Sequence, residues 1–270
     1  MNSYPTPCHQ TRSSSLSQPE ELQALVQSVT PARLLKGRVG PGYRTHTQLE
    51  LRRDHAAAQD AVLSEFQMKQ DFPADLIARL VLFEVQTQAR SKSEYLLRPD
   101  LGRRLGPDAE QTLKTRCRTG AELQILIGDG LSAAATRTQA PALLSELFKS
   151  ATTQGWHLGQ PFCVRYCRVG VLNEVGRILG PKVAVLLIGE RPGLATAESL
   201  SAYLAFDPHP GQTDAHRNLV SNIHSRGISV KEAANRILSL ASQIRDCQMS
   251  GPTIKERSPA CREMHALDVT

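Results

Sequence analysis

Short, unbroken apolar runs alternate with longer amphipathic stretches through the second half of the chain. The run at residues 183–188 is rich in β-branched residues and predicts a strand covered on both faces, and residues 122–127 and 162–165 predict two further strands. The stretches after them predict helices that end near residue 153, cover 172–179, and begin at 197. Because repeated strand–helix units imply a parallel sheet, we expect an α/β fold with a Rossmann-like parallel sheet domain.

Helical periodicity also dominates the first half and the end of the chain. It predicts helices over residues 22–29, 47–66, 107–117 and 230–248. The second of these opens with Thr47 and Glu50 at the spacing of a capping box, and the fourth opens with Ser229 and Glu232 in the same way. Residues 74–88 mix helical and alternating patterns and support no assignment.

These patterns divide the chain into four parts. Residues 1–19 are rich in Ser, Thr, Pro and Gln without periodicity, which predicts a disordered tail. Residues 20–118 form a smaller, mostly helical N-terminal region, and residues 119–251 form the α/β domain. Residues 252–270 lose the pattern and are assigned as a C-terminal tail.

Composition narrows the classes of function. The 270 residues include 32 basic and 26 acidic side chains, for a net charge of +6, and the Lys and Arg residues are scattered. Scattered charge with only 4% aromatic residues argues against a nucleic-acid platform, which needs a basic stripe and stacking rings. The sequence contains neither a secretory signal nor an apolar run long enough to span a membrane, so we expect a cytoplasmic protein.

The six cysteines point to free thiols rather than to a metal site. They include no C-x-x-C pair, and no histidine near Cys163 and Cys167 completes a zinc set. Cys163 and Cys167 fall in a strand-like segment, and the period of two residues in a strand predicts that both lie on one face. We therefore expect no metal ligands and reduced cysteines in a reducing compartment.

Two acids occupy equivalent places, each one residue beyond an apolar strand and beside glycine. They are Asp129 and Glu190. Because ligands of open α/β sheets bind outside the carboxyl ends of strands, both are candidate site residues on one rim. They can act as a general acid–base pair or as hydrogen-bond acceptors. Gly128-x-Gly130-x-x-Ala133 formally matches a dinucleotide fingerprint, but the acid that should follow the next strand is missing.

A cluster of arginines adds a second candidate. Arg98, Arg103 and Arg104 surround Pro99 and Asp100. They can anchor a phosphate or the carboxylates of a partner, or they can form an Asp100–Arg network that holds a turn.

Several ordered motifs resemble the small (light) subunit of ethanolamine ammonia-lyase. They are GRVGP at 37–41, YLLRPDLGRRL at 95–105, IGDGLS at 127–132, PFCVRYCRV at 161–169, GERPGL followed by ESLSAY at 189–203, and R-x-x-x-SNIH at 217–224. The resemblance runs from about Pro31 to Gly251. It implies an ammonia-lyase that depends on adenosylcobalamin and converts ethanolamine to acetaldehyde and ammonia by a radical mechanism.

The resemblance also implies a division of labour between two chains. A large subunit with a TIM barrel holds the substrate, the small subunit covers the barrel mouth, and the cofactor lies between them. The family assembles as a hetero-oligomer of six large and six small subunits, so this chain should not turn over alone. Family members can carry amphipathic N-terminal segments that direct them into ethanolamine microcompartments. The helix predicted at 22–29 is either such a segment or the first helix of the fold.

Three positions match the family's cobalamin contacts in this subunit: Val169, Glu190 and Leu219. Leu219 departs from relatives that have cysteine there, which matters only for a side-chain contact. Glu190 is expected to accept hydrogen bonds from the amide side chains of the corrin rim. Asp207-Pro-His209 only approaches the D-x-H-x-x-G pattern of histidine-on cobalamin binding, so we expect base-on cofactor with His209 at the surface.

Two readings from other classes stay open at this stage. The chain can be a stand-alone small-molecule-binding α/β domain that keeps the scaffold, or a nicotinamide-dependent oxidoreductase.

Overall fold

The computed structural model describes residues 18–30, 34–193 and 195–256 and divides into two compact units, residues 1–49 and 50–270. Each is described by itself. The first contains helix α1 (Gln18–Val29) and a hairpin of β1 (Arg38–Val39) and β2 (Gly42–Tyr43), in which Arg38 pairs with Tyr43. The apolar side chains Leu22, Leu25 and Val29 of α1 are exposed. Of the tail predicted at residues 1–19, residues 1–17 lie outside the described residues, and residues 18 and 19 belong to α1.

Helix α2 (Thr45–Leu63) crosses the boundary into the second unit. It begins before Thr47, so this threonine lies in the first turn rather than at the predicted capping position. The helices that follow in the second unit are α3 (Met68–Asp71), α4 (Ala74–Leu80), α5 (Lys92–Leu97), α6 (Pro107–Arg116), α7 (Ala133–Thr153), α8 (Val171–Leu179) and α9 (Val230–Cys247). Two short 3-10 helices cover Leu101–Arg103 and Asp214–His216.

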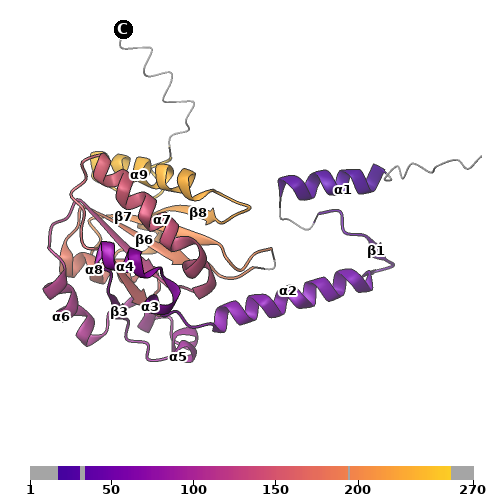
Figure 1. Ribbon diagram of the computed structural model, residues 1–270, viewed down its shortest axis with the longest axis horizontal. Coiled ribbons are helices and arrows are strands. Elements are labelled where there is room, and N and C mark those ends of the chain that lie inside the picture. The colour runs from indigo at the N-terminus through magenta and orange to yellow at the C-terminus, as the bar shows by residue number, and fades with distance from the viewer. Residues whose placement is uncertain (1–17, 31–33, 194, 257–270) are drawn as a thin grey trace, which may run out of the picture. The chain divides into compact units, whose positions relative to one another are not determined.

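A six-stranded sheet forms the centre of the second unit (Figure 1). Its order is β3 (Glu84–Gln86), β5 (Phe162–Arg165), β4 (Leu123–Gly128), β6 (Val183–Gly189), β7 (Leu200–Phe206) and β8 (Asn218–Ile223). The first four strands are parallel, whereas β7 is antiparallel to both of its neighbours. The α/β class is confirmed, and the sheet is mixed.

Two apolar layers cover the sheet. One joins α7 and α9 to alternate residues of the central strands, among them Ile125, Val185 and Leu204. The other joins α6 and α8 to the opposite face, through residues such as Leu126 and Leu186. Figure 1 shows α7 and α9 on one side of the strands and α6 and α8 on the other. Because β4 and β6 are buried on both faces, β6 is an unbroken apolar run and Gln124 is the one polar side chain of β4.

The predicted helix from residue 197 is wrong, and this error accounts for the wrong expectation of a wholly parallel sheet. Leu200–Phe206 is strand β7. Leu200, Ala202 and Leu204 lie in the core under α9, on one face of the strand. Such a mixture of small and apolar residues fits both the helical period and the two-residue period of a strand. The tertiary contacts decide that the segment is a strand. Thr196 accepts a hydrogen bond from the Glu198 N–H (3.1 Å) in the preceding loop instead of capping a helix.

Other segments follow the sequence more closely. Pro107 starts α6, and the Ser229 hydroxyl accepts from the Glu232 N–H at the start of α9 (3.3 Å). Residues 74–88 resisted assignment because α4 and β3 both lie within them. Beyond α9, the carbonyl of Ile254 accepts from the Asn218 amide (2.7 Å), so residues 252–256 pack on the domain. Cys163 and Cys167 are free but lie in opposite apolar layers, contrary to the prediction of one face.

Candidate functional site

A pocket of about 460 Å³ lies where the chain leaves β4, β5 and β6, against β7 and the edge strand β8. Val169, Glu190 and Leu219 all line it. These residues come from three separate segments of the chain, and the second unit of the fold brings them together. The predictions for these positions as cofactor contacts therefore refer to one place in the molecule.

Val169 is positioned by a turn that Asp129 organises. The carboxylate of Asp129 accepts the backbone N–H groups of Tyr166 (2.9 Å) and Cys167 (2.8 Å) immediately after β5. Tyr166 has a φ of 55°, in the left-handed region that a side chain enters only when its surroundings hold it there. This turn carries the chain past Val169 into α8.

Asp129 is thus an acceptor for the backbone and does not line the pocket. The side chain is buried, and burial raises the pKa of its carboxyl group, an effect that the neighbouring Lys92 ammonium opposes. Lys92 is buried as well, and its ammonium donates to the carbonyl of Gly130 (3.3 Å). Of the two acids predicted on the rim, only Glu190 lines the pocket.

One oxygen of Glu190 is held by the protein and the other is not. Oε1 accepts from the Ser201 hydroxyl (2.5 Å) and from the Asn222 backbone N–H (3.0 Å). No described residue donates a hydrogen bond to Oε2. The half-buried carboxylate is therefore fixed in orientation while it keeps acceptor capacity for a ligand.

A histidine holds the loop that supplies the Asn222 N–H. The Nδ1 of His224 accepts from the Arg226 N–H (3.2 Å), so Nε2 carries the proton and donates to Oδ1 of Asn222 (2.7 Å). Asn222 has a φ of 64°, a conformation that asparagine tolerates better than most residues. Burial, with help from the Arg226 charge, lowers the pKa of His224 and favours the neutral ring that this arrangement requires.

Leu219 lies on β8 opposite Tyr203, and 47% of it is exposed. Its neighbour Val220 is buried, as the alternation of a strand requires. Ser221 and Asn222 lie near the end of the same strand. Leu219 therefore offers an apolar side chain at the pocket wall.

Sequence reasoning missed two members of the pocket wall, Tyr95 and Arg168. The centre of the Arg168 guanidinium lies 4.4 Å from the centroid of the Tyr95 ring. The Tyr95 hydroxyl donates to the carbonyl of Cys167 (3.0 Å), so the ring is held against the same turn as Val169. Tyr95 lies in the motif at 95–105 and Arg168 in the motif at 161–169. Membership in these family-like motifs was the sequence signal that could have identified them as site residues.

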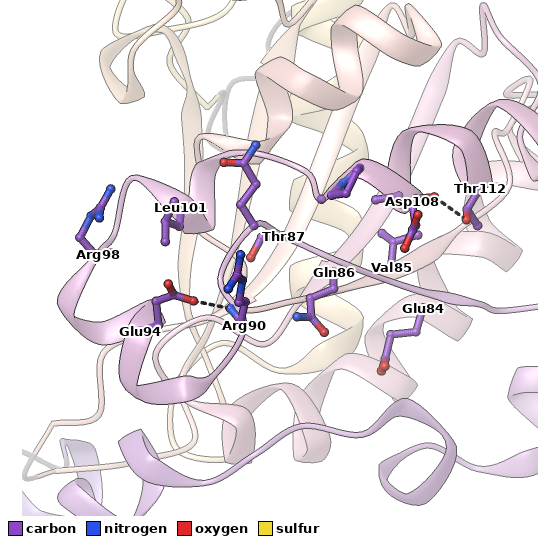
Figure 2. Close-up of a pocket in the computed structure, with 14 residues that line it drawn as sticks. Glu84, Val85, Gln86, Thr87, Arg90, Glu94, Arg98, Leu101, Asp108 and Thr112 are labelled. Atoms are coloured by element: carbon purple, nitrogen blue, oxygen red, sulfur yellow. Dashed lines mark hydrogen bonds between the residues drawn. The ribbon is translucent and has the colours of Figure 1, made fainter.

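A larger hollow of about 810 Å³ lies beside the edge strand β3 and the start of α6, and it contains none of the three predicted contacts (Figure 2). Its charged groups are largely engaged locally. Glu94 accepts from the backbone N–H of Arg90 (2.7 Å). Arg98 forms a two-pronged pair with Asp100 (3.0 and 2.8 Å), which supports the turn-holding reading of this arginine. We therefore regard the smaller pocket as the candidate site.

The glycine-rich turn after β4 packs on β6 and does not have the open N–H groups of a dinucleotide-binding turn. A Cβ on Gly130 would lie 2.2 Å from the carbonyl oxygen of Gly189, so this glycine permits close packing of the loop on β6. The Leu131 N–H donates to that same carbonyl (3.1 Å) and is not free for a pyrophosphate. The described residues contain no cluster of three or more metal-ligating side chains, and none of their helices is long and apolar enough to cross a membrane. His209 is exposed.

Comparison with known proteins gives a consistent result. Residues 19–255 match the sequence model of a family described as ethanolamine ammonia-lyase light chain. Proteins named ethanolamine ammonia-lyase small subunit are similar: that of Clostridium perfringens is 40% identical over 85% of this chain and 76% of its own length. The Fusobacterium nucleatum protein is 42% identical over 84% of this chain and 75% of its own. The Clostridium acetobutylicum protein is 37% identical over 87% and 95%, respectively.

Proposed function

Because the chain belongs to the family of ethanolamine ammonia-lyase light chains, we propose that it binds adenosylcobalamin jointly with a large subunit and supports the radical deamination of ethanolamine to acetaldehyde and ammonia. The observation that carries this proposal is the convergence of Val169, Glu190 and Leu219 on one pocket. In this proposal the bound cofactor supplies the radical that takes hydrogen from the substrate.

The residues of the pocket suit the cofactor. Oε2 of Glu190 is an acceptor to which none of the described residues donates, and the corrin rim carries amide donors. Leu219 offers apolar contact to the corrin, with 47% of the residue exposed. Pockets that enclose a drug-sized ligand measure about 300–1,000 Å³. A corrin with its nucleotide is larger than this pocket, which supports a cofactor shared with a second subunit.

The pocket also favours cofactor that keeps its own base on cobalt. No histidine occurs among the described residues that line it. His224 is buried and has both ring nitrogens engaged, by Asn222 and Arg226. In the proposed assembly, six of these chains combine with six TIM-barrel large subunits, which hold the substrate.

Reconstitution tests the proposal. The chain is co-expressed with the matching large subunit, the complex is purified, and acetaldehyde release from ethanolamine is followed after addition of adenosylcobalamin. We expect activity that needs both chains and the cofactor. A complex that binds no cobalamin contradicts the proposal, and failure to form a complex favours a stand-alone binding domain.

A further inference from the structure

Two arginines line the candidate pocket, and neither has an anionic partner among the described residues: Arg191, which is exposed, and Arg168, which is half-buried. Arg168 forms no ion pair there, and its Nε is buried without a hydrogen-bond acceptor. Two arginines outside the pocket do have an anionic partner, Arg177 with Glu110 (2.7 Å) and the buried Arg217 with Asp214 (2.7 Å), although the Nε of Arg217 also lacks an acceptor. Because a desolvated charge without a partner is costly, an unpaired arginine in a pocket indicates that a ligand or partner supplies the anion.

The guanidinium of Arg168 is held in place before any anion arrives. Its backbone N–H donates to the carbonyl of Gly102 (2.8 Å), and its stem lies so close to Gly102 that a Cβ there would come within 2.7 Å of it. The Tyr95 ring lies against the guanidinium. The planar fork of arginine matches phosphate geometry, and a fixed fork loses little conformational freedom on binding.

Lys92 and Asp129 carry opposite charges beside Arg168. Burial lowers the pKa of Lys92, the charges of Asp129 and Glu65 oppose this effect, and the charge of Arg168 adds a smaller lowering. Asp129 offsets Lys92, but both of its oxygens are committed to the N–H groups of Tyr166 and Cys167. A ligand at this site therefore meets a surplus of positive charge at Arg168 and an acceptor at Glu190.

We propose that Arg168 binds the phosphodiester of the cofactor's nucleotide loop. This inference rests on the proposed function. Adenosylcobalamin carries neutral amides around the corrin, and the phosphodiester is its anionic side-chain group. The two polar ends of the pocket then have separate tasks: Glu190 accepts from amides, and Arg168 donates to the phosphate.

The test measures preference for phosphate directly, with two ligands that differ only in that group. Complexes of the large subunit with wild-type or Arg168→Gln chain are titrated with adenosylcobinamide phosphate and with adenosylcobinamide, and the dissociation constants are read from visible absorption. We expect the wild-type complex to bind the phosphate-bearing ligand at least tenfold more tightly. Arg168→Gln should abolish that preference while its affinity for adenosylcobinamide stays within twofold.

A matched control is Arg104→Gln, which removes an exposed arginine that does not line the pocket and should keep the preference. If Arg168→Gln does not assemble, Arg168→Met keeps the apolar stem against Gly102 and replaces it in the test. A wild-type complex without the preference overturns the inference, as does a variant that retains it. An equal loss of both ligands, or a loss of subunit association alone, overturns it in favour of a packing or partner-binding role. Failure of the proposed function is recognised separately, because the wild-type complex then binds no adenosylcobalamin.

Discussion

The two carboxylate oxygens of Glu190 have different partners, so substitutions of this residue should affect stability and cofactor binding separately. In Glu190→Gln, the amide oxygen can keep accepting from Ser201 and from the Asn222 N–H, while an NH₂ group replaces the ligand-facing Oε2. The local structure is then retained, and a corrin amide donor meets a donor. In Glu190→Ala, the Ser201 hydroxyl, in a residue only 2% exposed, also loses its acceptor.

The structure sets different magnitudes for the two variants. A hydrogen bond to a charged group contributes about 1.5–3 kcal/mol, so Glu190→Gln should raise the dissociation constant for adenosylcobalamin by about 10- to 150-fold. Its free energy of unfolding should stay within about 1 kcal/mol of wild type, because a neutral hydrogen bond contributes of that order. Glu190→Ala should bind the cofactor as weakly and also lose about 1–3 kcal/mol of stability through the buried hydroxyl.

Cofactor affinity is measured by absorption titration of the two-subunit complex, and stability by urea unfolding of the purified chain. Glu198→Gln changes an exposed acid of the same loop that does not line the pocket, and it should alter neither quantity. An unchanged dissociation constant in Glu190→Gln refutes the role of Oε2 as an acceptor for the ligand. A stable Glu190→Ala refutes the account of Ser201.

Three further predictions concern the scaffold of the site. In Asp129→Asn, an NH₂ group replaces one of the two carboxylate oxygens that accept backbone N–H groups, so the free energy of unfolding in urea should fall by about 2–4 kcal/mol. A fall below about 1 kcal/mol contradicts the role of Asp129 in the turn. Gly176→Ala should destabilise by about 1–3 kcal/mol or more despite the better helix propensity of alanine, because its Cβ would meet the Pro208 carbonyl oxygen, and a gain in melting temperature contradicts this packing. The lowered pKa of His224 means that the unfolded chain takes up a proton near the ordinary value of 6.5 before the folded chain does, so this contribution to stability is present above pH 6.5 and is lost as the pH falls through the folded pKa. His224→Gln should reduce the drop in unfolding free energy between about pH 7.5 and pH 5, and an equal drop in both proteins refutes the assignment.

The sequence predicted best those features that depend on local pattern. Apolar runs predicted the strands β4, β5 and β6, and the capping residue Ser229 predicted where α9 begins. The prediction failed at Leu200–Phe206, where small and apolar residues fit both a helix and a strand. Pairing with β6 makes this segment a strand. No local signal indicates that this strand runs against its neighbour.

Part of the site was also within reach of the sequence. The three cofactor positions came from resemblance to a family, and the fold places them around one pocket. The role of Asp129 was not predictable, because the N–H groups that it accepts belong to a turn 37 and 38 residues away. The stacking of Arg168 on Tyr95 likewise joins residues distant in sequence, and no spacing rule connects them.

The pocket draws its walls from β5, β6 and, last along the chain, β8. During synthesis the N-terminal strands emerge first, and domains fold as units. A chain that ends before β8 lacks Leu219 and Ser221, so only chains that include this strand form the whole pocket. Occupancy then stabilises those molecules by about 2.7 kcal/mol when free ligand reaches 100 times its dissociation constant. In the proposed function, cofactor binding therefore stabilises chains that contain the edge strand and not chains truncated before it.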